Sequence, residues 1–316
     1  MKKNKINGVR PFNDFFFKSC YYHQLLAAVS SMGIDKDVVL LNAFSYIEEQ
    51  FQVKKTGVFK EKKLEKLLGY KRKASNLNKR MLIRCIDKKS SIIVGVDCYF
   101  LESRIDSYYM EHTPHFILVY GYDLTSLKLN VIDHDYINSY SYMEKEISMD
   151  NLLYANKMYK AGLCKNKYTC YVISPKRSKN EFNIWKFIDK TKIESNRINS
   201  RKNLTELKKI LTDGENVIKK NIERITFYLN DLKSFYFTFS RTKPFEINID
   251  EQLNIMALTS AYSNILSLFW KLKIQGKYEY VTKKIKNIMS KIDEIEQREE
   301  KLYNYLMEVH KASGKI

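Results

Sequence analysis

The sequence predicts an α+β domain followed by an α-helical bundle, and three observations indicate this fold class. Strand and helix patterns alternate up to about residue 178, whereas the rest of the chain has helical periodicity almost throughout. Hydrophobic residues make up 44% of the 316 positions, which is enough to bury a substantial core. Only 10 Gly and 4 Pro occur, too few for an all-β protein dominated by loops. We therefore expect two domains, at residues 1–178 and 179–316.

The first domain is expected to have an N-terminal helix packed on an antiparallel sheet. Apolar residues at helical spacing predict a helix over residues 20–32, which Gly33 ends, and a second helix over residues 38–51. Four segments rich in β-branched and aromatic residues are expected to be strands, namely 91–100, 115–122, 127–133 and 168–174. The second and third of these strands flank the turn sequence DLTS, so they should form a β-hairpin.

Three long amphipathic helices are expected in the second domain. Apolar residues recur at steps of three and four over residues 203–232, and Pro244 ends this pattern. A second helix begins with Asp250 as its N-cap and ends at Gly276. The last helix, over residues 281–309, has the alternating four-and-three spacing of a coiled coil. That spacing either closes a bundle, the interpretation we favour, or joins two copies of the chain as a homodimer.

The chain carries a formal net charge of +19, from 55 Lys and Arg against 36 Asp and Glu. Such a surplus favours acidic partners, which include nucleic acids, anionic lipids and acidic proteins. No apolar run is long enough to cross a membrane, so we expect no membrane span. Five cysteines, an odd number without a CxxC pair, and the lack of a secretion signal predict reduced thiols and a cytoplasmic location.

The predicted hairpin places a histidine beside an aspartate. We expect His115 to lie opposite Asp133. In this register Val119 faces Leu129, and every pair on that face is apolar except the terminal one. Side chains directly opposite each other on paired strands have Cβ atoms about 4.5–5.5 Å apart. A carboxylate at that distance orients an imidazole and holds it in one tautomer, as in a catalytic dyad.

Cys20 is the candidate nucleophile that would complete a catalytic triad. It stands at the predicted start of a helix, where the helix dipole and free N–H groups stabilise a thiolate. The other four cysteines are less suited, because they fall in or near predicted strands or in a lysine-rich loop. Taken alone, Cys20 is more simply explained as an ordinary buried thiol. The expected pair of His115 and Asp133 is the observation that favours a catalytic role for it.

The order of these motifs resembles a known family. The segments SCYYHQLLAAVSSMG, VGVDCYFLESRIDSYYMEHTPHFILVYGYD and VID follow one another as in the N-terminal domain of the butirosin biosynthesis protein H family. The similarity covers about residues 10–175 and implies a papain-like fold related to the C39 peptidases. The helical second domain also agrees with the architecture of that family.

The resemblance implies an acyltransferase that forms an amide bond in natural-product biosynthesis, including that of antibiotics. Cys20 would take the acyl group from a carrier-protein thioester, His115 would act as the base and Asp133 would orient it. Three further residues are expected to line the substrate pocket, namely Tyr21, Asp97 and Tyr99. No cofactor is expected, because the phosphopantetheine arm of the carrier arrives as part of the substrate.

One feature departs from the papain-like pattern, in which a Gln shortly before the Cys donates a hydrogen bond to the oxyanion. Here only Asn13 and Asp14 stand upstream, and an ionised Asp cannot donate. Asn13 is therefore the expected oxyanion donor, unless backbone N–H groups take that role.

Charge is distributed unevenly within the first domain. Residues 54–89 contain 14 basic and three acidic residues, whereas residues 91–156 contain three basic and ten acidic ones. The basic segment suits an acidic acyl or peptidyl carrier protein, and the acidic segment suits a cationic amine acceptor. For any single one of these residues, a solvated surface position is the simpler explanation.

Three other functions stay open at this point. The same Cys, His and Asp could hydrolyse an amide, so a C39-like cysteine peptidase or amidase is the main alternative. His112 and His115 have an H-x-x-H spacing that could bind a metal ion, but at the start of a strand they would point to opposite faces. Nucleic-acid binding is not expected, because no recognised binding signature accompanies the KRKASNLNKR stretch.

Overall fold

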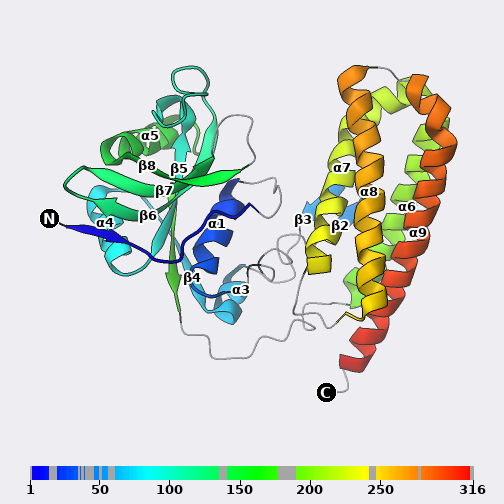
Figure 1. Ribbon diagram of the computed structural model, residues 1–316, viewed down its shortest axis with the longest axis horizontal. Coiled ribbons are helices and arrows are strands. Elements are labelled where there is room, and N and C mark those ends of the chain that lie inside the picture. The colour runs from blue at the N-terminus through cyan, green and yellow to red at the C-terminus, as the bar shows by residue number, and fades with distance from the viewer. Residues whose placement is uncertain are drawn as a thin grey trace. The chain divides into compact units, whose positions relative to one another are not determined.

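The computed structural model describes residues 2–13, 20–34, 36, 39, 46–49, 52–55, 61–134, 141–176, 190–241, 247–276 and 279–313. The chain forms two compact units (Figure 1). The first contains Met1–Lys36 and Glu61–Phe182, and the second contains Asp37–Lys60 and Asn183–Ile316. Residues 37–60 thus group with the helices of the second unit, although the sequence places them in the first domain.

A short hairpin accounts for this grouping. Strand β2 (Tyr46–Glu49) pairs antiparallel with β3 (Gln52–Lys55), and the hairpin contacts helices α6 (Lys190–Thr212) and α7 (Glu215–Arg241). The helix predicted over residues 38–51 is therefore wrong for residues 46–49, and most of its other positions lie outside the described residues. The backbone hydrogen bonds of residues 46–49 are made with β3, across the hairpin. The periodicity of apolar residues within one segment does not reveal such pairing with another segment.

The first unit is built on a seven-stranded antiparallel sheet, so the predicted α+β class is confirmed. Along the sheet the strands run in the order β4 (Tyr70–Ser75), β9 (Cys170–Pro175), β5 (Ser91–Asp97), β6 (Pro114–Asp123), β7 (Lys128–His134) and β8 (Tyr142–Ser148). Strand β1 (Lys3–Lys5) pairs with the far end of β6, beyond the stretch that β5 occupies.

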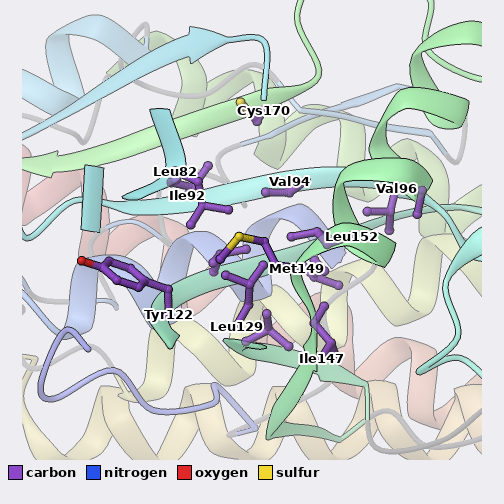
Figure 2. Packing of buried hydrophobic residues seen from close by; sticks show 14 of the residues in the cluster. Leu82, Ile92, Val94, Val96, Tyr122, Leu129, Ile147, Met149, Leu152 and Cys170 are labelled. Carbon is purple, nitrogen blue, oxygen red and sulfur yellow. The ribbon is translucent and has the colours of Figure 1, made fainter. Parts of the chain in front are cut away.

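Helices cover both faces of this sheet. The apolar cluster in Figure 2 joins α4 (Lys79–Asp87) and α5 (Met149–Gly162) to alternate residues of β5, such as Ile92 and Val94. Phe116 of β6 points the other way from its neighbour Ile117, which belongs to that cluster. The ring of Tyr21 lies 5.6 Å from the ring of Phe116, so α1 (Cys20–Ser30) covers the opposite face. Helix α3 (Glu61–Leu68) contacts the edge strand β4.

The predicted hairpin of β6 and β7 exists, but its register was predicted two residues away from the observed one. Val119 pairs with Val131 instead of Leu129, and a bulge between Val119 and Gly121 shifts the pairing again before the turn. The alternation of apolar residues cannot distinguish registers that differ by two, because both leave the same side chains on the same face.

The second unit contains four long described helices rather than the three expected. The segment 203–232 spans the end of α6 and most of α7, which are separated at Gly214, where φ is +98°. A glycine adopts this left-handed conformation without strain and ends α6 there. Helix α8 (Ile249–Gln275) has Asn248 rather than Asp250 as its N-cap, and Gly276 ends it as predicted.

The last helix, α9 (Glu279–Ser313), uses its heptad seam inside the bundle. Its seam residues Ile288, Ile292, Ile295 and Leu302 are buried, and α9 packs along both α6 and α8. This outcome agrees with the closed bundle that the sequence analysis favoured. No helix within the described ranges is long and apolar enough to cross a membrane.

Candidate functional site

The structure brings Cys20, His115 and Asp133 together at the end of the sheet away from the β6–β7 turn. Cys20 is the first residue of α1, His115 is the second residue of β6, and Asp133 is the last but one of β7. The Nε2 atom of His115 lies 2.8 Å from Oδ1 of Asp133. A second side-chain hydrogen bond links His115 to the Cys20 thiol. Because Nε2 is taken by Asp133, Nδ1 is the ring nitrogen that is left for the sulfur.

The two-residue difference in register does not separate the histidine from the aspartate. A shift of two keeps both side chains on the same face and makes them diagonal neighbours instead of direct ones. Diagonal positions are about 7–8 Å apart at the backbone, which long or aromatic side chains can span. The sequence therefore identified the right pair of side chains from an incorrect register.

The electrostatics of the pair favour a thiolate and an imidazolium. Burial alone would raise the pKa of the partly buried Cys20 thiol, but the hydrogen bond and charge of His115 hold it below its ordinary value of 9.0. Burial alone would lower the pKa of His115, but its hydrogen bonds with Asp133 and Cys20 raise it to about 9. The interaction between Cys20 and His115 contributes to both shifts, because each charged form stabilises the other, while Asp133 makes the largest contribution that raises the pKa of His115.

Asp133 is fully buried and surrounded by positive groups. Burial by itself would raise its pKa, but the hydrogen bond with His115 and the charges of Arg104 and Lys145 lower it. Arg104 Nη1 lies 3.6 Å from Asp133 Oδ1, while Nε and Nη2 of the same guanidinium bind Asp106. The backbone N–H of His134 donates to the same Asp133 oxygen over 2.7 Å.

Arg104 belongs to this site, although no pattern in the sequence predicted it. The residue lies in the connection between β5 and β6, where neither strand nor helix periodicity predicts the direction of a side chain. Its burial, with 7% of the residue exposed, is the feature that distinguishes it from a surface arginine.

Three other cysteines have the opposite electrostatics. Burial raises the pKa of Cys85, and it raises those of Cys98 and Cys170 to about 12. A thiol of this kind stays protonated at neutral pH and is a poor nucleophile. Among these four cysteines, Cys20 is the one whose surroundings favour the thiolate.

The predicted oxyanion donor, Asn13, has a different set of contacts. Its Nδ2 donates to the backbone oxygen of Tyr142 over 2.8 Å, and its Oδ1 accepts from the backbone N–H of Tyr142 over 2.7 Å. Both hydrogen bonds attach the N-terminal segment to the start of β8. The described contacts of Asn13 therefore indicate a structural role and do not reach Cys20.

Tyr21 and Asp97 are also engaged by neighbouring side chains. The hydroxyl of Tyr21 accepts from Arg72 Nη1 over 2.8 Å, and burial raises the pKa of this tyrosine to about 12. Asp97 is buried, accepts from the backbone N–H of Tyr99, and lies 2.7 Å from Nδ1 of His112. The His112 ring stacks on Tyr99 with centroids 4.2 Å apart.

The two histidines of the H-x-x-H spacing bind different carboxylates. His112 pairs with Asp97, and His115 pairs with Asp133. They do not share a set of ligands, so the spacing does not form a metal site between them.

Basic side chains line a hollow of about 770 Å³ beside α4 and β4. We call it the basic groove, and its cations are Lys71, Lys73, Arg80, Arg84 and Lys88. The last three recur every four residues and so share one face of α4 and its C-cap, while the two lysines share one face of β4. No acidic residue lines the groove, and among the described residues none of its five cations forms an ion pair.

Comparison with known proteins does not assign this chain to a family: no family model matches the sequence, and no curated protein shows significant similarity to it.

Proposed function

We propose that the protein is a papain-like cysteine acyltransferase that moves an acyl group from a carrier-protein thioester to an amine and forms an amide bond. The observation that supports this most directly is the continuous hydrogen-bonded series from Cys20 through His115 to Asp133. Nucleophile, base and orienting carboxylate are the three groups that thiol-based acyl transfer requires. The resemblance in sequence supports the choice of a thioester donor and of a natural-product pathway.

In the first half-reaction the Cys20 thiolate attacks the carbonyl carbon of the thioester. The bond to the carrier sulfur breaks, and His115 gives its proton to the leaving thiolate of the phosphopantetheine arm. In the second half-reaction the amine attacks the new Cys20 thioester, and His115 takes the proton that the amine loses. The amide leaves and the Cys20 thiolate returns. Asp133 keeps Nδ1 of His115 directed at the sulfur through both steps.

Backbone N–H groups are the better candidates for the oxyanion donors. Helix α1 begins at Cys20, and the first N–H groups of a helix have no partner within the helix. They carry the positive end of the helix dipole next to the reacting sulfur. Asn13, in contrast, is held by Tyr142.

The basic groove suits the acidic surface of a carrier protein. Its cations are spaced about 6 Å apart along α4, which matches acidic side chains one turn apart on a helix of the partner. The groove shares Lys71 and Ser174 with a second hollow of about 620 Å³, which Arg72 and Tyr171 also line. Arg72 binds the hydroxyl of Tyr21, the residue after Cys20. The second hollow therefore adjoins the groove, and one of its lining residues contacts the neighbour of the candidate nucleophile.

The proposal is tested by intact-mass spectrometry of the full chain after mixing with acyl-loaded carrier protein. We expect a mass increase equal to the acyl group on the wild type, no increase on Cys20→Ala, and loss of the adduct when amines are added, with the amide as product. Cys170→Ala is the matched control and should acylate normally, because burial raises the pKa of the Cys170 thiol to about 12 and the residue lies outside the groove.

Two outcomes would contradict the proposal. Adduct formation on Cys20→Ala would exclude Cys20 as the nucleophile. An adduct that water discharges but amines do not, together with cleavage of peptides or simple amides, would support the C39-like peptidase or amidase instead.

Reversing the charge of the basic groove is expected to weaken recognition of the carrier without changing the chemistry. For Arg80→Glu/Arg84→Glu we expect the second-order rate of acylation by carrier-bound thioester to fall by about tenfold or more at low salt. The rate with a small acyl thioester should stay unchanged. Lys157→Glu/Lys160→Glu on α5 changes the net charge by the same amount and is the control, since both lysines are exposed and lie outside the groove. Equal losses for both thioesters would rule out the groove as the docking surface.

A further inference from the structure

Helix α8 has apolar side chains on two faces. One face lies in the core of the bundle and includes the buried Ile255, Leu258 and Phe269. Five large apolar side chains on another face are between 40% and 78% exposed, namely Ile249, Leu253, Met256, Trp270 and Ile274. Within the described part of the second unit, α6, α7 and α9 therefore leave this second face uncovered.

The exposed residues have the spacing of a coiled-coil seam. The steps alternate between four and three along the whole helix, with three serines between Met256 and Trp270. We call the eight positions the α8 seam: Ile249, Leu253, Met256, Ser260, Ser263, Ser267, Trp270 and Ile274. The seam is about 38 Å long at 1.5 Å per residue. Single exposed apolar residues are ordinary on a protein surface, but large apolar residues at heptad positions near both ends of one helix indicate a partner helix.

The α8 seam is complementary to itself when two copies run antiparallel. In one register Ile249 of each copy faces Ile274 of the other. The same register places Leu253 opposite Trp270, and Ser260 opposite Ser263 near the two-fold axis. Every such pair occurs twice, as an isologous interface requires. We propose that a second copy of this chain binds along the α8 seam in this antiparallel register and forms a two-fold symmetric dimer.

The sizes of the side chains agree with this arrangement. Helices that pack along each other cross at about 20°, so they are closest near the crossing point and diverge toward both ends. The α8 seam has its small residues, the three serines, near the centre and its large residues at the ends. The small residues allow close approach at the axis, and the large ones fill the space where the helices separate.

Charge favours the antiparallel orientation over the parallel one. Asp250 flanks the seam at the start of α8, and Lys271 flanks it near the end. Antiparallel pairing places Asp250 of each copy beside Lys271 of the other, on the same side of the seam. Parallel pairing would bring the two Asp250 ends together and the two Lys271 ends together, which is unfavourable.

The dimer is tested by sedimentation velocity of the full chain over a wide range of concentration. We expect a monomer–dimer equilibrium for the wild type. Leu253→Glu should raise the dimer dissociation constant by at least about 100-fold, because it places two unpaired carboxylates in the interface. Ile198→Glu is the matched control. Ile198 is a large aliphatic residue of the same unit and is 55% exposed, but it lies on α6, outside the seam.

Charge reversal tests the register without changing the apolar residues. Asp250→Lys alone and Lys271→Asp alone should each weaken the dimer, and the double variant Asp250→Lys/Lys271→Asp should recover it. A wild type that stays monomeric at every concentration overturns the proposal. So does a dimer that Leu253→Glu leaves intact, or one in which the double variant is as weak as the single ones.

Discussion

His115→Ala is expected to slow the acylation of Cys20 by about 10²–10⁴-fold at neutral pH, the usual loss when a general acid–base group is removed. The alanine removes the charge and the hydrogen bond that lower the pKa of the Cys20 thiol, and it leaves the opposing effect of burial. The pKa of Cys20 should then rise above its ordinary value of 9.0.

The pH dependence of alkylation measures this change without knowledge of the substrate. We expect the rate at which iodoacetamide modifies wild-type Cys20 to fall as pH drops through the pKa of the thiol, which lies below its ordinary value of 9.0. In His115→Ala the rate should increase with pH and reach half of its maximum only above pH 9. Peptide mass spectrometry separates Cys20 from the other four thiols.

His134→Ala is the matched control for this experiment. The His134 ring lies against the His115 ring, with centroids 4.8 Å apart. Burial, together with the charges of His115 and Arg104, lowers the pKa of His134 to about 4, so it is neutral at pH 7. Its removal should leave the alkylation profile of Cys20 unchanged. Equal profiles for the wild type and His115→Ala would mean that His115 does not activate the thiol.

Glu299→Ala is expected to reduce the free energy of unfolding of the second unit by about 3 kcal/mol or more. Glu299 is buried in α9 and binds one hydroxyl from each of the other three long helices of the unit. Tyr236 of α7 and Tyr262 of α8 each donate to it over 2.6 Å, and Ser200 of α6 donates as well. Alanine would remove the carboxylate that accepts from these three buried hydroxyls.

The loss in free energy of unfolding is measured by denaturant unfolding of the full chain, with tryptophan fluorescence as the signal. Trp270 lies on α8 of the second unit, so a Trp185→Phe background, which leaves Trp270 as the single tryptophan of the chain, makes this signal report that unit. Tyr236→Phe is the graded control and should cost about 1 kcal/mol, because it removes a single hydrogen bond and keeps the ring. If Glu299→Ala were as stable as Tyr236→Phe, Glu299 would not stabilise the unit through all three hydrogen bonds.

The shifted pKa of Glu299 also predicts how the stability of the second unit depends on pH. Burial raises the pKa of Glu299 above its ordinary value of 4.5, and the three hydrogen bonds only partly offset this. The folded state therefore keeps a proton that the unfolded state loses, and the contribution of Glu299 to stability falls as pH rises above 4.5 through the folded pKa. Glu299→Gln cannot titrate, so the difference in stability between it and the wild type should change across this range.

The sequence by itself determined the fold class and the identity of the candidate triad. The alternation of apolar residues in 115–122 and in 127–133 can be recognised within each short segment, without knowledge of the rest of the fold. It predicts a strand with one buried face in each segment. For this reason the hairpin, the side-by-side placement of His115 and Asp133, and the helix beginning at Cys20 could all be predicted. Gly276 could be predicted as a helix end because its left-handed conformation is a local requirement.

Only the tertiary structure decided the features that depend on contacts between distant residues. The register of β6 and β7 is set by the whole sheet, because a shift of two leaves the apolar pattern unchanged. Arg104 reaches Asp133 from a connection that has no periodicity. The hairpin of residues 46–55 groups with the second unit, although it lies far from those helices along the chain. Which face of α8 is exposed depends on how α6, α7 and α9 pack against it, because the exposed fraction of a side chain depends on all of its neighbours.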